Sequence, residues 1–307
     1  MQVILAQPRG FCAGVVRAIK IVERALGADG TTVYVLHEIV HNRHVVEDLK
    51  KQGALFIEKL DQAPAGAVTI FSAHGVSTAV VREAEKRALK VIDATCPLVT
   101  KVHLQAQRYS RQGFEVIIIG HPGHPEVEAT RGWVEGSVYV LSKKAEVDRL
   151  NVRNPNRLAY VTQTTLSLDD TREVIDALKR RWNNIRGPEL TDICYATQSR
   201  QNAVRQLAGQ IDLLLVVGAS NSSNSNRLRE VGEQSGLASY LIEDLENLNP
   251  RWFTQKTRVG ITAGTSAPEA MVRKVLERLH AYGVTKVGEM EGEPEKMTFR
   301  LPESLFP

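Results

Sequence analysis

Cys12, Cys96 and Cys194 are the only cysteines of the 307-residue chain, and a helix-like run follows each of them. A polar residue follows each cysteine at nearly the same offset, 29, 28 and 28 positions on: His41, His124 and Ser222. One thiol in each of three repeats is a poor pattern for disulfides. It is well suited to bringing three thiolates to one point, and the thiolate is the form of cysteine that binds metal.

Each cysteine lies immediately before, or in the first turn of, its predicted helix, where a thiol pKa is lowered. Three thiolates without a fourth fit an iron–sulfur cluster with one open iron, or a catalytic zinc with an open position. Three buried structural cysteines are the simplest alternative. The shared position in all three repeats disfavours that alternative, and ligation by sulfur alone favours iron–sulfur over zinc.

Two sets of polar loops follow the predicted strands, at 41–43, 121–126 and 221–226 and at 72–75, 162–165 and 262–266. Ligands of parallel α/β sheets bind at these carboxyl ends of strands. Hydroxyls, amides and helix N-termini are the groups that a phosphate or diphosphate needs. Helix capping and ordinary hydrogen bonding are the alternative roles of these residues. The candidate anion-binding residues are His41, His74, His124, Thr164, Thr165, Ser222, Ser223, Asn224 and Ser266.

Glu126 is the candidate catalytic carboxylate. It follows His124 and Pro125 in a turn-prone loop beside the predicted metal ligands. A carboxylic acid that burial keeps partly protonated can deliver a proton, and a neighbouring histidine or threonine can orient it. The alternative is an acid in the first turn of a helix, where it stabilises the helix dipole.

The elements that must position these residues alternate between short continuous apolar runs and amphipathic stretches. This alternation predicts an α/β fold with parallel sheets covered on both faces. The predicted strands are 3–6, 33–36, 68–71, 116–119, 159–161, 213–217 and 259–261, and the clearest predicted helices are 78–89, 168–182 and 268–282.

The long repeat predicts three related small α/β domains in a pseudo-threefold arrangement around a central cavity. The predicted domains are 1–95 with Cys12, 96–193 with Cys96 and 194–288 with Cys194. Residues 289–307 are polar and interrupted by proline, and we expect them to form a C-terminal tail packed over another domain.

The overall composition is that of a globular protein, with 43% hydrophobic and 24% charged residues. The net charge of +4 is small and no Lys/Arg block occurs, so nucleic acid is not an expected partner. No apolar run is long enough to span a bilayer, and no signal segment is recognisable. Few, unpaired cysteines indicate a reducing cytoplasm.

With these motifs in hand, the chain resembles the 4-hydroxy-3-methylbut-2-enyl diphosphate reductases, the LytB/IspH family, over nearly its whole length. One variation, AGTSAP at 263–268, stands beside a phosphate contact and should matter little. The segments that carry the resemblance are PRGFCAGV (8–15), HEIVHN (37–42), FSAHGVS (71–77), DATCPLV (93–99), GHPGHPE (120–126), TQTTLS (162–167), DICYAT (192–197) and SNSSNSN (220–226).

The resemblance implies a [4Fe-4S] cluster held by Cys12, Cys96 and Cys194, with the open fourth iron facing the substrate. It implies a diphosphate site formed by His41, His74, Ser222, Ser223, Asn224 and Ser266, with His124 lining the pocket. Thr164 lies near the substrate hydroxyl in this family, and Glu126 corresponds to its proton donor. The implied reaction is the last step of the non-mevalonate isoprenoid pathway, with electrons from a carrier such as ferredoxin or flavodoxin.

Two other functions remain compatible with the residues alone. A (de)hydratase or quinolinate-synthase-like lyase would use the open iron only as a Lewis acid, and a requirement for reductant separates it from a reductase. A non-catalytic iron or redox sensor would need a partner or DNA surface, which the sequence does not indicate.

Overall fold

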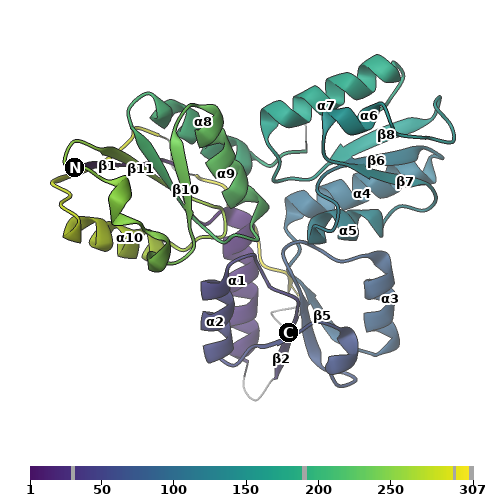
Figure 1. The fold of residues 1–307 in the computed structure, drawn as a ribbon. Coiled ribbons are helices and arrows are strands. Elements are labelled where there is room, and N and C mark those ends of the chain that lie inside the picture. Colours follow the sequence, from purple (N-terminus) through teal and green to yellow (C-terminus); the bar gives the residue numbers. More distant parts are fainter. Residues whose placement is uncertain (29–31, 189–191, 293–294, 304–307) are drawn as a thin grey trace. The chain divides into compact units, whose positions relative to one another are not determined.

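The computed structural model describes residues 1–28, 32–188, 192–292 and 295–303. Its strands form three separate sheets in which every pair of neighbouring strands is parallel (Figure 1). The predicted α/β class with parallel sheets is therefore confirmed.

The first sheet has the strand order β3-β2-β4-β5. Its strands are β2 (Val33–Leu36), β3 (Leu55–Ile57), β4 (Val68–Phe71) and β5 (Lys90–Asp93), and α1 (Ala13–Leu26), α2 (Arg43–Lys51), the 3-10 turn η1 (Leu60–Gln62) and α3 (Thr78–Lys86) alternate with them. Leu36 and Phe71 pack with Val80 and Val81 of α3. The Ser77 side chain caps α3 by accepting from the Val80 N–H.

The second sheet has the order β7-β6-β8 and helices on both faces. Ile117 and Ile119 of β6 pack against α7, whereas Val116 and Ile118 pack against α4 and α5. Because successive residues of β6 are buried on opposite faces of the sheet, its sequence is a continuous apolar run. The elements are α4 (Pro97–Arg111), β6 (Glu115–Ile119), α5 (Pro125–Arg131), β7 (Val138–Leu141), α6 (Lys144–Val147), β8 (Leu158–Thr162) and α7 (Leu168–Arg181).

The third sheet has the order β10-β9-β11-β1-β12. Leu213, Leu215 and Val217 of β9 pack with α10 on one face, while Leu214 and Val216 pack with α8 and α9 on the other (Figure 1). The elements are β1 (Gln2–Leu5), α8 (Tyr195–Ala208), β9 (Leu213–Val217), α9 (Ser223–Gln234), β10 (Ala238–Ile242), the 3-10 turns η2 (Leu245–Asn247) and η3 (Pro250–Trp252), β11 (Arg258–Ala263), α10 (Glu269–Ala281) and β12 (Lys286–Glu289).

All seven predicted strands and the three predicted helices are present, with ends that shift by at most three residues. The sequence pattern misses β3, β5, β7, β10 and β12, all of which lie at a sheet edge. These five strands are only partly buried, as expected for strands with a neighbour on one side only.

The chain divides into two compact units. Unit 1 comprises Met1–Val15, His41–Val45 and Tyr195–Met297, and unit 2 comprises Val16–Val40, Val46–Cys194 and Thr298–Pro307. Unit 1 contains the five-stranded sheet, including β1, and unit 2 contains the other two sheets. The domain limits 1–95, 96–193 and 194–288 and the pseudo-threefold arrangement stay predictions.

Part of the predicted tail 289–307 has defined contacts. Glu289 ends β12, which pairs with β1. The Arg300 carbonyl accepts from Nε of Arg17 at 2.9 Å within unit 2. Residues 293–294 and 304–307 of the tail lie outside the described residues.

A search of the described helices finds none with the length and apolar character needed to cross a membrane.

Candidate functional site

All three cysteines occupy the same local position, directly before the helices α1, α4 and α8. Cys96 is the N-cap residue of α4 and Pro97 is its first helical residue, as predicted. Each cysteine N–H donates to a carbonyl of the second set of strand-end loops: Cys12 to Thr265 at 3.2 Å, Cys96 to Ala73 at 3.0 Å and Cys194 to Thr164 at 3.0 Å. The repeat that the sequence predicts is therefore also a repeat of backbone hydrogen bonds.

The three cysteines are half-buried and free of disulfides. Burial raises the pKa of the Cys12 thiol, while the backbone N–H groups of Val15 and Gly14 and the charge of Arg200 act in the opposite direction. Among the described residues, no group of three or more His, Cys, Asp or Glu side chains is arranged to hold a metal ion. The ligand set of the cluster therefore stays a prediction. The residues present do fit it, because three thiols at equivalent helix N-termini are suitable donors for iron.

Glu126 is buried, with 2% of its surface exposed, in the first turn of α5. Its Oε1 accepts from the Thr164 backbone N–H at 2.6 Å, and its Oε2 accepts from the Thr164 hydroxyl at 2.9 Å. Burial raises the pKa of Glu126 from 4.5 to about 7, although both Thr164 donors act to lower it. Because this pKa lies near neutrality, the carboxyl can hold and release a proton at physiological pH.

His124 is the N-cap residue of α5, and its Nδ1 accepts from the Glu126 N–H at 3.2 Å. An accepting Nδ1 carries no proton, so a proton on this ring sits on Nε2. The rings of His74 and His124 meet edge to face, with centroids 6.0 Å apart. Unit 2 thus brings together His74, His124, Glu126 and Thr164, four of the predicted site residues.

Gly75 fixes the turn that carries His74. Its φ of +78° lies in the left-handed region, and a Cβ there would overlap the ring of His103. His103 is buried and stacks on Trp133 with centroids 5.7 Å apart, and burial lowers its pKa to about 4. The indole Nε1 of Trp133 donates to the Val76 carbonyl at 2.9 Å. This packing gives His103 a structural role in supporting the turn at Gly75.

Thr165 accepts at its hydroxyl from Nε2 of Gln163 at 2.8 Å, and Oε1 of Gln163 accepts from the His121 N–H at 3.0 Å. The capping alternative for Thr164 and Thr165 is wrong, because Ser167 caps α7. Gln163 was not among the predicted site residues, although it lies in the same strand-end loop.

In unit 1 the loop after β11 connects three of the predicted anion-binding residues, His41, Asn224 and Ser266. The Ser266 hydroxyl donates to the His41 carbonyl at 2.9 Å. Oδ1 of Asn224 accepts from the Thr265 N–H at 2.9 Å, and its Nδ2 donates to the Thr197 hydroxyl at 3.4 Å. Because Thr265 also accepts from Cys12, one loop connects Asn224 with Cys12.

The capping alternative for the 221–226 loop is confirmed for Ser222, whose side chain accepts from the Ser225 N–H and caps α9. The loop is not fully solvated, however, because Ser222, Asn224 and Ser225 are buried. Ser223 is the first residue of α9 and is half-buried. In the cap the Ser222 hydroxyl acts as an acceptor and does not use its own O–H, so capping is compatible with donation to an anion.

The predicted site residues are divided between the two units, and their convergence on one cavity stays a prediction. Unit 1 carries Cys12, His41, Ser222, Ser223, Asn224 and Ser266, and unit 2 carries His74, Cys96, His124, Glu126, Thr164, Thr165 and Cys194.

Three residues outside the predicted site have structural partners. Arg9 forms ion pairs with Glu269 and Glu289, and His37 pairs with Glu58. The buried Arg200 is a residue that sequence reasoning missed. The sequence does indicate its burial. Arg200 lies on the helix face formed by the small and apolar residues Ala196, Ala203, Val204 and Leu207, which the helical period places toward the core.

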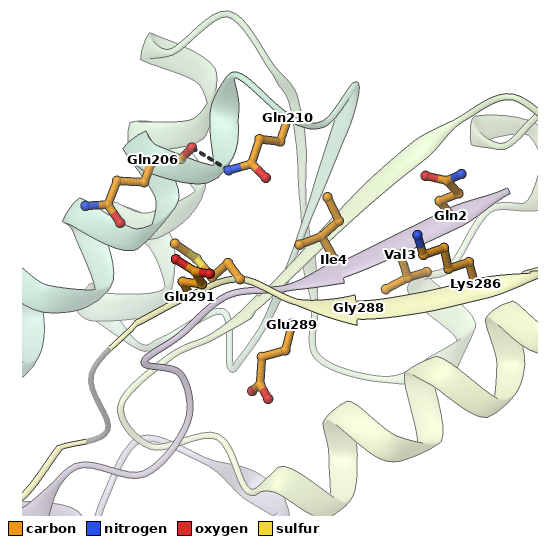
Figure 2. A pocket seen from close by; sticks show the side chains of 10 residues that line it. Gln2, Val3, Ile4, Gln206, Gln210, Lys286, Gly288, Glu289 and Glu291 are labelled. Carbon is orange, nitrogen blue, oxygen red and sulfur yellow. Dashed lines mark hydrogen bonds between the residues drawn. The ribbon is translucent and has the colours of Figure 1, made fainter.

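A cavity of about 610 Å³ lies beside the edge strand β12 in unit 1 (Figure 2). It is lined by Gln2, Val3, Ile4, Gln206, Gln210, Lys286, Gly288, Glu289, Met290 and Glu291. None of these ten residues belongs to the predicted site.

The profile of the LytB protein family matches residues 3–280. The 4-hydroxy-3-methylbut-2-enyl diphosphate reductase of Pseudomonas putida is 58% identical, covering 99% of this chain and 98% of the relative. The enzyme of the same name from Burkholderia pseudomallei is 59% identical, covering 99% and 97%.

Two solved structures are also similar. The E-1-hydroxy-2-methyl-but-2-enyl-4-diphosphate reductase of Plasmodium falciparum matches with a TM-score of 0.93 and 36% identity over 99% of this chain and 96% of that one. A structure of (E)-4-hydroxy-3-methyl-but-2-enyl diphosphate reductase, described as the terminal enzyme of the non-mevalonate pathway, matches with a TM-score of 0.66 and 33% identity, covering 91% and 99%.

Replacing Thr164 by valine should raise the pKa of Glu126 further. The hydroxyl of Thr164 donates to the carboxylate and so favours its ionised form, and valine keeps the shape but removes that donor. We expect an upward shift of about one unit, typical of one lost hydrogen bond. Carbon-13 NMR of labelled glutamate carboxyls measures it.

Thr165→Val is the matched control, because the Thr165 hydroxyl accepts from Gln163. An unchanged Glu126 titration in Thr164→Val, or an equal shift in both variants, would contradict the described hydrogen bonding.

Proposed function

The chain belongs to the LytB protein family, and on this premise we propose that it reduces (E)-4-hydroxy-3-methylbut-2-enyl diphosphate to isopentenyl and dimethylallyl diphosphates. The reaction consumes two electrons and two protons and releases the allylic hydroxyl as water. It is the last step of the non-mevalonate isoprenoid pathway. The observation that carries the proposal is the match to relatives of this activity over 99% of the chain.

The lyase alternative is not favoured. Relatives with high identity carry the name of a reductase and not of a lyase. A lyase would convert its substrate without net electron transfer, so a requirement for reductant separates the two activities.

The proposed cofactor is one [4Fe-4S] cluster held by Cys12, Cys96 and Cys194. Three thiolate ligands leave one iron without a protein ligand, and that position is open to the substrate hydroxyl. When bound, the cluster would pass on the two electrons of the external donor one at a time and would act as a Lewis acid for the leaving hydroxyl. The equivalent placement of the three cysteines before α1, α4 and α8 supports this ligand set.

Glu126 is the proposed proton donor, and Thr164 positions it. Both carboxyl oxygens are hydrogen-bonded to one residue, so the carboxyl has a fixed orientation. Because burial makes its ionised form unfavourable, the group retains its proton up to a pH of about 7. It can then protonate the hydroxyl as the carbon–oxygen bond breaks, which makes water the leaving group.

The diphosphate of the substrate is proposed to bind His41, His74, Ser222, Ser223, Asn224 and Ser266. His124 and Thr165 line the same pocket, and Thr164 lies near the substrate hydroxyl. Hydroxyl and amide donors at the N-terminus of α9 suit an anion. Binding at the diphosphate end holds the reacting carbon in one position, which lowers the entropic cost of reaction.

Electrons are proposed to come from a small carrier such as ferredoxin or flavodoxin, and the protein is proposed to act in the cytoplasm. A cluster exposed to oxygen is readily damaged, so a reducing compartment suits the cofactor. The small set of unpaired cysteines is consistent with that compartment.

The activity is tested with protein reconstituted anaerobically with iron and sulfide. We expect the hydroxylated diphosphate to be converted to the two isoprenyl diphosphates only when a reductant such as dithionite with methyl viologen is present. Mass spectrometry identifies the products. Conversion at the same rate without reductant would support a lyase and contradict the proposal.

Glu126→Gln should reduce turnover at least about 100-fold, because the amide keeps the shape of the carboxyl but cannot donate the proton. Iron content and diphosphate binding should be retained. Glu128→Gln is the matched control, since Glu128 lies in the first turn of the same helix but is exposed. Turnover of Glu126→Gln within a few-fold of the unmodified enzyme would exclude Glu126 as the donor.

A further inference from the structure

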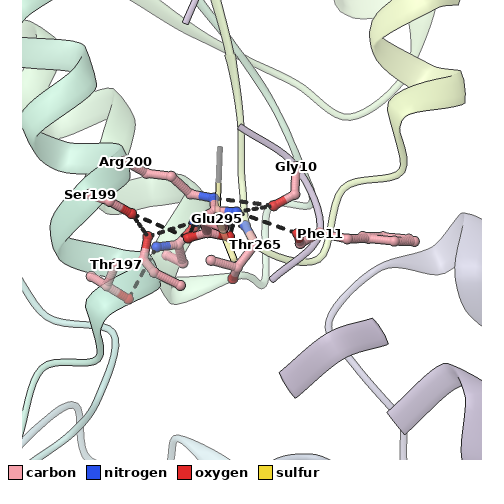
Figure 3. A network of polar contacts seen from close by, with 9 residues as sticks. Gly10, Phe11, Thr197, Ser199, Arg200, Thr265 and Glu295 are labelled. Carbon is pink, nitrogen blue, oxygen red and sulfur yellow. Dashed lines mark hydrogen bonds and ion pairs between the residues drawn. The ribbon is translucent and has the colours of Figure 1, made fainter. Parts of the chain in front are cut away.

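Arg200 of α8 is fully buried, with 0% of its side chain exposed. A buried arginine is unfavourable unless its charge and its N–H groups are paired. Its hydrogen-bond partners among the described residues lie within unit 1, and they come from three separate segments of the chain (Figure 3). Neither the proton transfer nor the diphosphate binding proposed above uses this residue.

The guanidinium holds the loop that leads into Cys12. Nε and Nη2 of Arg200 donate to the Gly10 carbonyl at 3.1 and 2.7 Å, and Nη2 also donates to the Phe11 carbonyl at 3.5 Å. Figure 3 shows Arg200 reaching from its helix toward these two backbone groups. Because they are the two residues before Cys12, their position determines where the thiol lies.

The same loop is fixed from its other side by the strand-end loop of β11. The Gly10 N–H donates to the Ala263 carbonyl at 3.0 Å, and the Cys12 N–H donates to the Thr265 carbonyl. Gly10 has a φ of +70°, and a Cβ there would lie 3.3 Å from the Ala267 carbonyl oxygen. The loop therefore fits closely between the arginine and the β11 loop.

The counterion of Arg200 comes from the C-terminal segment. Glu295 accepts from Nη1 at 2.6 Å through Oε1 and from Nη2 at 3.0 Å through Oε2, which forms a two-pronged ion pair. Its carboxylate is largely buried, with 15% exposed, and it also accepts from the Ser199 hydroxyl. Such a pair has a defined geometry, so the C-terminal segment fixes the guanidinium and through it the loop.

From these contacts we propose that Arg200 is a positioning residue for the cluster ligand Cys12, and that Glu295 of the C-terminal segment locks it in place. Arg200 acts through the backbone of Gly10 and Phe11. The inference rests on the proposed function insofar as Cys12 is a cluster ligand. It extends that function by giving Glu295, near the C-terminus, a role in retaining the cluster.

The hydrogen bonds that hold the Cys12 backbone extend to Asn224 of the proposed diphosphate site. Thr265, which accepts from Cys12, donates its N–H to Asn224, and Asn224 donates to Thr197 on α8. Thr197 and Arg200 lie about one turn apart on that helix. One helix therefore positions both a cluster ligand and an anion-binding residue.

The test compares Arg200→Lys and Glu295→Gln in the full chain, before and after reconstitution with iron and sulfide. Lysine keeps the charge but lacks the planar fork that spans two carbonyls and a carboxylate. We expect amide hydrogen exchange of the peptide containing Cys12 to become at least about tenfold faster in Arg200→Lys, with a smaller increase in Glu295→Gln. Release of iron to a chelator should accelerate with it.

Arg258→Lys is the matched control, because Arg258 pairs with Asp212 in the same unit but is exposed. Exchange of the central strand β9 reports on the stability of the whole sheet. Faster exchange confined to the Cys12 loop, together with faster iron release, supports the proposal. Unchanged exchange in that loop, an equal increase in β9, or faster loop exchange with unchanged iron release overturns it.

The exchange measurement also separates this inference from the proposed function. Failure of the unmodified protein to take up iron would contradict the cluster and, with it, the role of Arg200 in retaining a cluster ligand. Exchange in the metal-free chain would still show whether Arg200 fixes the loop.

Discussion

The hydrogen bonds of Thr164 connect the two chemical components of the site. Its N–H and hydroxyl bind the carboxyl of Glu126, and its carbonyl accepts from the N–H of Cys194. A displacement of this residue would therefore move the proposed acid and one proposed cluster ligand together. The rest of unit 2 supports that arrangement: β8 places Thr164 at its carboxyl end, and α5 carries Glu126.

The burial that makes Glu126 a useful acid has a cost in stability. Its pKa is about 7 in the folded protein and ordinarily 4.5, so between these values the folded state binds the proton more tightly than the unfolded state. The contribution of this group to the free energy of unfolding therefore falls as the pH rises from 4.5 through 7. At neutral pH the fold keeps a partly ionised, buried carboxylate, stabilised by the two donors of Thr164. The buried charge of Arg200 is likewise unfavourable by itself, and its ion pair with Glu295 stabilises it.

Much of the fold and of the candidate site could be predicted from the sequence. The central parallel strands are continuous apolar runs, and each cysteine occupies the same position in its repeat, directly before a helix. Glu126 was predicted from its place beside His124, and its partner Thr164 was predicted independently as a loop residue. The edge strand β12 could not be predicted, since its sequence KVGE has little apolar character, and β3 is apolar but only three residues long. Nor could the pairing of Arg200 with Glu295, which lie 95 positions apart and meet only through the tertiary fold. The placement of β1 between β11 and β12 likewise depends on long-range pairing.

In the proposed function a protonated Glu126 delivers the proton that removes the hydroxyl. This step is tested most directly by the pH dependence of kcat/KM for reduction of the hydroxylated diphosphate by the reconstituted enzyme, with reductant in excess. Because the donor must be protonated and its pKa is about 7, the rate should be highest below that pH. Above it the rate should fall about tenfold for each further pH unit. A rate that stays constant up to pH 9 would contradict the assignment.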